Sequence, residues 1–435
     1  MTIRQRLRAF WRGSVWTWAP ESEREAGEAI VRNLWLHWFP NKVAIASARW
    51  SYSLWLGTAS AALFLILLVT GMLLMFFYVP SVERAYWSMK DLRFAVSFGW
   101  LLRNQHRWAA HLMVGATFLH MARVFFTGAY RGPRGLNWLV GIALLLATLL
   151  LSFTGYLLPW DQLAFWAVTV GTNIAREAPL AGASIRFLLL GGTEIGQATL
   201  LRFYVLHVFV LPVAVLLLFA YHMWRIRKDG GLAAVEPTRS ARASRVVATS
   251  PSKSYSIFGV TRGTSIQTLS TTALEEEDVA FSSPELVRRI MLVFLLVFNL
   301  TLLLSVFFDA PLEQAANPAV TPNPAKAPWY FLWLQELVAS TTVRIGGVTV
   351  SGGFIGGILV PGVLLLLAVA WPFLDRSPAG IEGIWFAAQR RRQNLLFALI
   401  ALGMIALILL SMYCRGPSWG FYWPWQAWPQ PPTSL

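Results

Sequence analysis

The chain has 435 residues, of which 56% are hydrophobic and only 13% are charged. A soluble domain carries roughly a quarter charged residues, so this composition is that of a membrane protein. The net charge of +15 does not indicate a nucleic-acid partner, because the basic residues lie in short clusters between apolar segments. The single cysteine, Cys414, excludes an internal disulfide, a Cys-x-x-Cys-His haem attachment and an iron–sulfur cluster.

Residues 1–50 form the first segment. The stretch from Met1 to Trp18 is basic and has no apolar core ending in a small-residue cleavage site, so we expect a cytoplasmic N-terminus and no signal peptide. Residues 26–48 mix apolar and basic side chains, among them Trp35 and Trp38. This mixture predicts an amphipathic helix in the membrane interface.

Seven apolar windows follow, each long enough to cross a bilayer, which takes about 20 helical residues. The second and fourth are less uniformly apolar, and each is associated with two histidines about one membrane leaflet apart. The sequence therefore predicts an all-α membrane protein with seven transmembrane helices. The windows cover residues 53–78, 108–128, 137–158, 203–224, 290–308, 353–374 and 395–413.

Basic residues set the orientation of these helices. They lie before the first window, after the second and fourth, before the fifth, and between the sixth and seventh. With a cytoplasmic N-terminus, all of these segments fall on the inner side, as the positive-inside rule requires, and the C-terminus lies outside. The basic residues of the clusters that follow the first window are Arg123, Arg131, Arg134, Arg225, Arg227, Lys228, Arg288, Arg289, Arg390, Arg391 and Arg392.

A polar segment divides the chain into two halves. Residues 233–285 are rich in Ser, Thr, Ala and Arg and contain no spanning window. We interpret them as a cytoplasmic linker. The linker separates a four-helix domain at residues 51–232 from a three-helix domain at residues 286–435.

Four histidines carry the functional prediction. His106 and His120 are 14 residues apart, and His207 and His222 are 15 apart, so each pair shares a helix face with about 21–22 Å between its members. Both helices run from the outer to the inner side in the predicted topology. His106 therefore lies level with His207 near the outer side, and His120 with His222 near the inner side.

Two opposed imidazoles at each level are typical of b-type haem held in a helix bundle. We therefore predict two non-covalent haems, with His106 and His207 as ligands of the outer one and His120 and His222 as ligands of the inner one. The alternative for any single histidine is a structural residue or a proton relay. His111 is about 140° from the His106 face, and we interpret it, like His37 in the interfacial segment, as structural.

Glycines in the other two helices repeat the histidine spacing. Gly57 and Gly71 are 14 residues apart, as are Gly141 and Gly155. Backbone without a Cβ allows a flat macrocycle to approach closely, although such glycines also serve ordinary helix packing. Arginines flank the ligands and could pair with haem propionates or extend to lipid head groups. They are Arg103 and Arg202 at the outer level and Arg123 at the inner level.

Three stretches resemble a known family. They are Gln105-His106-Arg107-Trp108 with Leu119-His120-Met121-Ala122-Arg123, then Gly155-Tyr156-Leu157-Leu158-Pro159-Trp160-Asp161-Gln162, then Arg202-Phe203-Tyr204-Val205-Leu206-His207 through His222 to Ile226-Arg227-Lys228. These resemble cytochrome b of quinol–cytochrome c and quinol–plastocyanin oxidoreductases. The 15-residue spacing resembles the plastid and bacterial short form, and the second half resembles its separate subunit IV, here joined by the linker.

The resemblance implies a function. Family members oxidise quinol at the outer haem level, pass one electron to a Rieske iron–sulfur protein, and send the other through both haems to a quinone at the inner side. It also implies a homodimeric complex with Rieske and c-type cytochrome partners, in this case in the cytoplasmic membrane of a bacterium.

The chain departs from the family at the outer quinol pocket. The family's Pro-Glu-Trp-Tyr motif is Ala327-Pro328-Trp329-Tyr330 here, so the glutamate that accepts a proton from quinol is absent. Such variants resemble complexes that use menaquinol. We expect Trp329 and Tyr330 in the pocket, and Glu336 is the nearest candidate acid. The alternative for Glu336 is a solvated or salt-bridged loop residue.

A second departure concerns a third haem. Short-form members attach a c-type haem to a cysteine early in the first span, and Trp55 stands at that position, so we predict no covalent haem. Two other readings of the whole chain stay open. One is a di-haem membrane anchor of another quinone-linked oxidoreductase, and the other is a seven-span transporter or receptor that uses the histidines for protons or ligand.

Overall fold

The structure is a computed structural model that describes residues 2–4, 42–229, 231–233, 279–281, 285–345 and 347–428. The predictions for the rest of the N-terminal segment, including most of the interfacial helix at 26–48, lie outside the described residues. The same is true of most of the linker at 233–285. Of those segments, β1 (Lys42–Ala44) pairs antiparallel with β2 (Val279–Phe281), and α3 (Ile45–Ala48) and α4 (Trp50–Ser53) follow β1.

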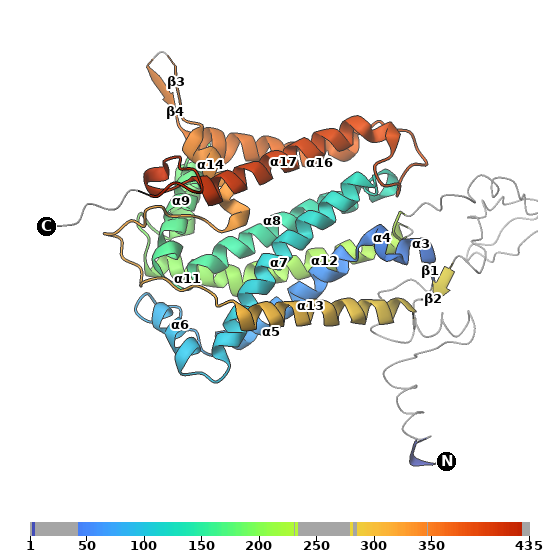
Figure 1. Ribbon diagram of the computed structural model, residues 1–435, viewed down its shortest axis with the longest axis horizontal. Coiled ribbons are helices and arrows are strands. Elements are labelled where there is room, and N and C mark those ends of the chain that lie inside the picture. The colour runs from blue at the N-terminus through green and yellow to red at the C-terminus, as the bar shows by residue number, and fades with distance from the viewer. Residues whose placement is uncertain are drawn as a thin grey trace, which may run out of the picture.

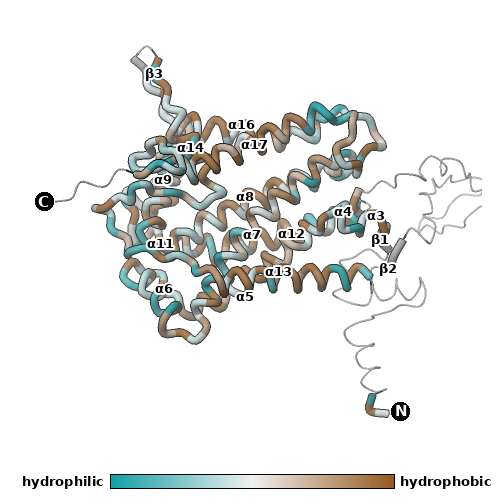
Figure 2. Tube along the Cα trace, in the orientation of Figure 1, coloured by the Kyte–Doolittle hydropathy of each residue, from teal (hydrophilic) through white to brown (hydrophobic). Residues whose placement is uncertain are grey.

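Seven helices in the described part of the chain are long and apolar enough to cross a membrane, which confirms the predicted fold class. Apolar residues run along these helices and hydrophilic residues gather at the ends (Figure 2). Because a bilayer offers no hydrogen bonds to the backbone, only such regular helices satisfy it there. The spans are Leu56–Met75, Gly99–Phe126, Gly132–Leu157, Gln197–Lys228, Val287–Phe307, Gly352–Leu374 and Ala388–Cys414.

The first four spans form a bundle. α5 (Leu56–Met75) packs along α7 (Gly99–Phe126), and α8 (Gly135–Leu157) packs along the fourth span, which consists of α11 (Gln197–Val205), the π-helical segment η3 (Leu206–Val210) and α12 (Leu211–Lys228). α7 also contacts α8. The two histidine-bearing helices are thus each flanked by a glycine-bearing helix, as the matched spacings predict.

The helices of the second half are distributed around this bundle. α13 (Val287–Phe307) packs on α5 and α7. α16 (Val360–Leu374), preceded by α15 (Gly352–Phe354) and the π-helical segment η7 (Ile355–Leu359), packs on α8, and α17 (Arg391–Cys414) packs on α14 (Trp329–Ser340). Figure 1 shows α13 on one side of the bundle and α16 with α17 on the other. The second half therefore flanks the first on two sides.

Short elements cover the two ends of the bundle. α6 (Ala85–Phe94), α9 (Gln162–Arg176), α10 (Gly182–Leu190), α14 and the hairpin of β3 (Val343–Ile345) and β4 (Val348–Val350) lie at one end, and α3 and α4 lie at the other (Figure 1). By the predicted topology the first end is the outer side. The short helices η2 (Gly132–Arg134), η8 (Ala388–Arg390) and η9 (Pro417–Trp419) complete the described elements.

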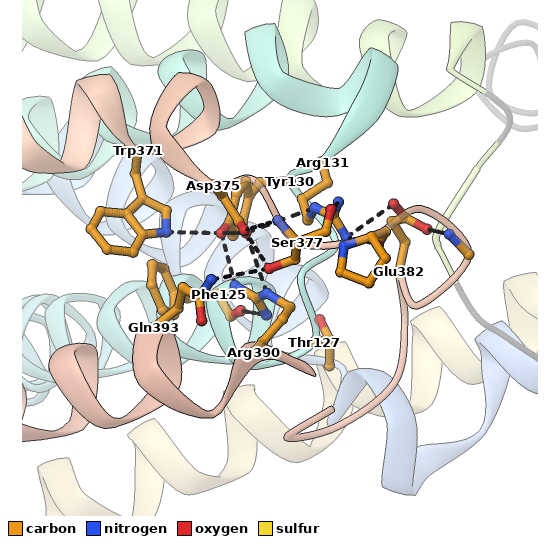
Figure 3. Close-up of polar contacts among 12 residues, drawn as sticks. Phe125, Thr127, Tyr130, Arg131, Trp371, Asp375, Ser377, Glu382, Arg390 and Gln393 are labelled. Atoms are coloured by element: carbon orange, nitrogen blue, oxygen red, sulfur yellow. Dashed lines mark hydrogen bonds and ion pairs between the residues drawn. The ribbon is translucent and has the colours of Figure 1, made fainter. Parts of the chain in front are cut away.

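A buried polar network joins the two halves near the inner end of α7 (Figure 3). Arg390, which is fully buried, donates from Nη1 to the Phe125 carbonyl at 2.7 Å and from Nη2 to the Tyr130 hydroxyl at 2.8 Å. Its Nε lies 3.3 Å from Oδ2 of Asp375, which also accepts from Tyr130. Hydrogen-bonded charges of this kind fix how the halves dock, since a misplaced charge would remain buried without a partner.

Candidate metal centres and outer cavity

The four predicted ligand histidines meet in two pairs. The rings of His106 and His207 have centroids 6.2 Å apart, and those of His120 and His222 have centroids 6.4 Å apart. Each pair takes one ring from α7 and one from the fourth span. The pairing by depth that helical arithmetic predicts is therefore the arrangement in the structure.

The spacing of the rings suits an iron with two axial imidazoles. A metal–imidazole bond is about 2 Å and the nitrogen lies roughly 1.1 Å from the ring centre, so two such rings on one metal have centroids about 6.3 Å apart. Within the described residues, no group of three or more His, Cys, Asp or Glu side chains could hold a metal ion. A site with two protein ligands fits a metal whose remaining ligands come from a macrocycle.

Hydrogen bonds fix the tautomers of the outer pair. His207 Nδ1 lies 3.1 Å from the Leu151 carbonyl, which can only accept, so this nitrogen carries the proton. His106 Nδ1 lies 2.8 Å from Oγ1 of Thr70, whose own hydroxyl donates to the Ile66 carbonyl at 2.7 Å. His106 is therefore the donor as well. In both rings Nε2 keeps its lone pair, as a metal ligand must.

The inner pair is held differently. Among the described residues, Nδ1 of His120 is buried without a hydrogen-bond partner, whereas the His222 ring lies beside the Asn137 backbone. Arg123 lies at this level with its guanidinium 4.3 Å from the centre of the Tyr52 ring, and its buried Nη2 also makes no hydrogen bond within the described chain. A buried cation with a spare donor is suited to an anionic group such as a haem propionate.

Three of the four predicted glycines lie against the histidine rings. A Cβ at Gly155 would lie 2.5 Å from Cε1 of His207, one at Gly71 would lie 3.3 Å from Cε1 of His106, and one at Gly57 would lie 3.1 Å from Cε1 of His120. Gly141 differs, because a Cβ there would meet nothing within 4 Å. The spacing thus points to three positions at which a side chain would crowd an imidazole, most severely at Gly155.

His207 lies in the π-helical segment η3 at Leu206–Val210. Pro212 follows at the start of α12 and has no N–H to donate to the preceding turn, which accounts for the local widening of the helix. Such single widened turns are frequent at functional sites. The widening determines where the His207 ring leaves the helix.

A cavity of about 290 Å³ opens beside the outer pair. Its inner part is lined by His106, His207 and the glycines at 71 and 155. The rest of its wall contains polar side chains from both halves of the chain, namely Arg103, Arg107, His111, Tyr156, Asp161, Glu313 and Tyr330. The cavity therefore joins a candidate metal centre to a polar chamber.

Of the two α14 residues expected in the quinol pocket, Tyr330 lines the cavity and Trp329 is not among its lining residues. Tyr330 is 5% exposed, and burial raises the pKa of its phenol. The neighbouring Trp329 donates from Nε1 to Nδ1 of His111 at 3.1 Å. Both residues thus contact α7 at His111, which follows the ligand histidine His106 by five residues.

The two outer arginines have different surroundings. Arg103 lines the cavity and donates to the carbonyls of Ala310 and Pro311 at 2.7 Å each. Arg202 is exposed, donates to the Leu188 carbonyl, and does not belong to the described cavity wall. Because its side chain turns toward α10, the position of Arg202 does not support the expected role in pairing with a haem propionate.

Glu336 also lies away from the cavity. Its carboxylate is 1% exposed and accepts from Ser411 Oγ at 3.0 Å, from Trp419 Nε1 at 3.0 Å and from Arg415. Burial raises the pKa of this group, but the hydrogen bonds from Arg415 and Ser411 outweigh that effect and hold the pKa below its usual value. Glu336 is therefore a buried, salt-bridged residue outside the cavity wall, and its position does not support a role as proton acceptor.

The sequence and fold are similar to those of known proteins that agree with this arrangement of histidines. Residues 42–230 match the family model described as cytochrome b/b6/petB, and residues 315–422 match that described as cytochrome b(C-terminal)/b6/petD. Cytochrome b6 of Acaryochloris marina is 43% identical over 175 residues, which are 40% of this chain and 81% of that protein. The chain belongs to the cytochrome b/b6 family.

Other relatives support the same family. Cytochrome b6 of Gracilaria tenuistipitata var. liui is 44% identical over 167 residues, 38% of this chain and 78% of that protein. A chain of a solved structure described as "Hyperthermophilic respiratory Complex III" has 25% identity and a TM-score of 0.63, with 82% of this chain and 83% of that chain covered. Both halves of this chain thus match proteins of the cytochrome b/b6 family.

Sequence reasoning missed five of the polar residues in the cavity wall, namely Arg107, His111, Tyr156, Asp161 and Glu313. Arg107 and Asp161 lie inside the motifs that carry the family resemblance, so their positions were a usable signal. Asp161 is 7% exposed, and burial raises its pKa although it accepts hydrogen bonds from the Ala164 and Glu313 N–H groups. His111, which we interpreted as structural, lines the same cavity.

Proposed function

We propose that the chain holds two non-covalent b haems, one between His106 and His207 and one between His120 and His222, and that it contains no covalent haem. The chain is the cytochrome b subunit of a quinol-oxidising electron-transfer complex. The observation that carries the haem assignment is the pairing of four imidazoles at two depths with ring spacings of 6.2 and 6.4 Å. When bound, such a haem passes single electrons and leaves no open position for oxygen.

The residues around each pair prepare it to ligate. Thr70 and the Leu151 carbonyl hold the outer rings in the tautomer that leaves Nε2 free. Arg103 and Arg107 at the outer level, and Arg123 at the inner level, supply positive charge for propionates.

We propose the polar part of the outer cavity as the quinol-oxidising site, with Tyr330 in its wall and Trp329 behind it, hydrogen-bonded to His111. Oxidation of a quinol breaks two O–H bonds and releases two electrons and two protons. A haem held by His106 and His207 would take one of these electrons, and a partner iron–sulfur protein would take the other. We assign Asp161 as the acceptor of one proton, because it is the buried carboxylate of the cavity wall.

The chain works within a multi-subunit membrane complex. We propose a Rieske iron–sulfur protein, a c-type cytochrome or both as partners, a homodimeric assembly, and menaquinol as the quinol. We further propose the cytoplasmic membrane of a bacterium, with the N-terminus inside and the C-terminus outside. The clusters of basic residues at one end of the spans support that orientation.

A di-haem anchor of another quinone-linked oxidoreductase is the nearest alternative. The cavity argues against it, because Tyr330 of the second half shares its wall with His106 and His207 of the first. A transporter or receptor would have no need of rings at the spacing of bis-histidine ligation.

The test is purification of the complex in mild detergent with identification of the subunits that accompany it. We expect a Rieske protein or a c-type cytochrome, and reduction of b haem by added quinol that a stigmatellin-type inhibitor alters. Co-purification with a flavin dehydrogenase, or a preparation without b haem, would contradict the proposal.

A further inference from the structure

His111 is the one cavity histidine, among the described residues, that the proposed haem ligation does not use. It lies on α7 five residues after His106, away from the ligand face. The ring is packed between aromatic side chains, with centroids 5.7 Å from Trp108 and 5.6 Å from Tyr330. These ring contacts and the hydrogen bond from Trp329 hold His111 at the cavity wall.

The hydrogen bond from Trp329 fixes the tautomer of His111. An indole N–H can only donate, so Nδ1 of His111, 3.1 Å away, must be the acceptor. A neutral ring whose Nδ1 accepts carries its hydrogen on Nε2. Nε2 makes no hydrogen bond with any part of the chain that the structure describes.

The surroundings leave that N–H available to a ligand. The wall of the same cavity also contains Tyr330, which contacts the His111 ring, Arg107, and the carboxylates of Asp161 and Glu313. The basic nitrogen of His111 is taken by Trp329, so in this arrangement the ring can donate a hydrogen bond but cannot take a proton from quinol. This separates it from Asp161, which can accept a proton.

We propose that His111 donates a hydrogen bond from Nε2 to a ring oxygen of the quinone-type molecule in the outer cavity and thereby positions its head group. The inference rests on the proposed quinol site. His111 is a positioning residue, and no electron or proton passes through it. Trp329 acts through His111, because its hydrogen bond selects the tautomer that presents the donor.

The competing explanation is that His111 only anchors the start of α14 to α7 by accepting from Trp329. Two substitutions separate the roles. His111→Asn keeps an acceptor near the position of Nδ1 and removes the donor at Nε2. His111→Gln places an amide N–H near the position of Nε2 and removes the acceptor for Trp329.

The experiment measures binding of menadione, a naphthoquinone with two carbonyl acceptors, to the oxidised holo-complex by titration calorimetry. No turnover occurs without reductant, and a reduced-minus-oxidised spectrum of each sample checks its haem content. Loss of one neutral hydrogen bond should weaken binding of the His111→Asn variant roughly three- to tenfold, while His111→Gln stays within about twofold of wild type.

Equal affinity of wild type and His111→Asn would overturn the inference and leave the proposed function standing. Weak binding by His111→Gln with normal binding by His111→Asn would also overturn it, since that pattern belongs to an anchoring role. Failure of the wild-type complex to bind menadione or a substituted benzoquinone would contradict the quinol site itself.

Discussion

At the residue scale, the two histidine pairs differ in how their Nδ1 atoms are held. The outer rings donate to Thr70 and to the Leu151 carbonyl, whereas the inner ring of His120 has no such partner among the described residues. A hydrogen-bonded Nδ1 makes an imidazole a stronger donor to its metal. The two levels thus offer electronically different ligands from the same residue type.

The proposed proton acceptor gives a pH prediction. Asp161 can take a proton only when ionised, so quinol oxidation should fall as the pH drops through its pKa, which burial raises above that of an ordinary carboxyl. Asp161→Asn keeps an oxygen that can cap α9 at the Ala164 N–H but removes the base. We expect the rate to fall on the order of 100-fold and the acidic limb of the pH profile to disappear.

Glu336→Gln provides the comparison for that profile. Glu336 is ion-paired with Arg415 outside the cavity wall, so this variant should keep a pH profile of wild-type shape. Steady-state quinol oxidation from pH 5 to 9 measures both. If Asp161→Asn retained the acidic limb and Glu336→Gln lost it, the two assignments would have to be exchanged.

The candidate site was only partly predictable from residue patterns. The ligand pairs follow from spacing and topology alone, because both are properties of single helices. Glu336 could not be judged in this way, since its partner Arg415 lies 79 positions later in the chain and meets it only through the packing of α14 on α17. His111 was set aside by helical angle, but Trp329 approaches it from another half of the molecule.

At the element scale, α5 and α8 present glycines to the imidazole rings, so that the rings pack directly against the helix backbone. Gly155 of α8 is the tightest position, with His207 Cε1 at 2.5 Å from an added Cβ. A contact this short cannot be accommodated without moving the ring, because the Leu151 carbonyl already fixes its Nδ1. The seven predicted spans are confirmed, and they could be predicted because hydropathy marks a membrane-spanning helix. The π-helical turn at Leu206–Val210 could not be predicted in this way, because it does not change the hydropathy of the span.

We therefore predict that Gly155→Ala displaces the outer ligand and spares the inner one. The haem content should fall from two toward one per chain, with the remaining b haem keeping its spectrum. Gly115→Ala is the matched control, because a Cβ on that α7 glycine would meet nothing within 4 Å. A full haem complement in Gly155→Ala would show that the His207 ring is not confined as described.

At the scale of the whole molecule, hydrogen bonds connect the second half to the first at both ends of the bundle. On the outer side, Asp161 accepts from the Glu313 N–H at 3.1 Å and Gln162 accepts from the Asn317 N–H at 2.7 Å. On the inner side, Arg390 ties α17 to the end of α7 (Figure 3). The outer cavity lies where the two halves meet, because its wall contains His106 and His207 of the first half and Tyr330 of the second.

Removing the inner tie should loosen the assembly. Arg390→Met leaves the carboxylate of Asp375, whose side chain is fully buried, without its closest cation, and loss of one partner of a buried pair costs about 3–5 kcal/mol. We expect thermal unfolding of the detergent-solubilised complex at a lower temperature than for the exposed neighbour variant Arg391→Met. Equal stability of the two variants would contradict a docking role for Arg390.

The central claim is that two pairs of histidines hold two b haems, and the haem content of single-ligand variants tests it most directly. Pyridine haemochrome analysis and reduced-minus-oxidised spectra of the purified complex should give two b haems per wild-type chain. His207→Leu should remove the outer haem alone and His222→Leu the inner haem alone. A wild-type chain without b haem, or a His207→Leu chain that keeps both, would contradict the account.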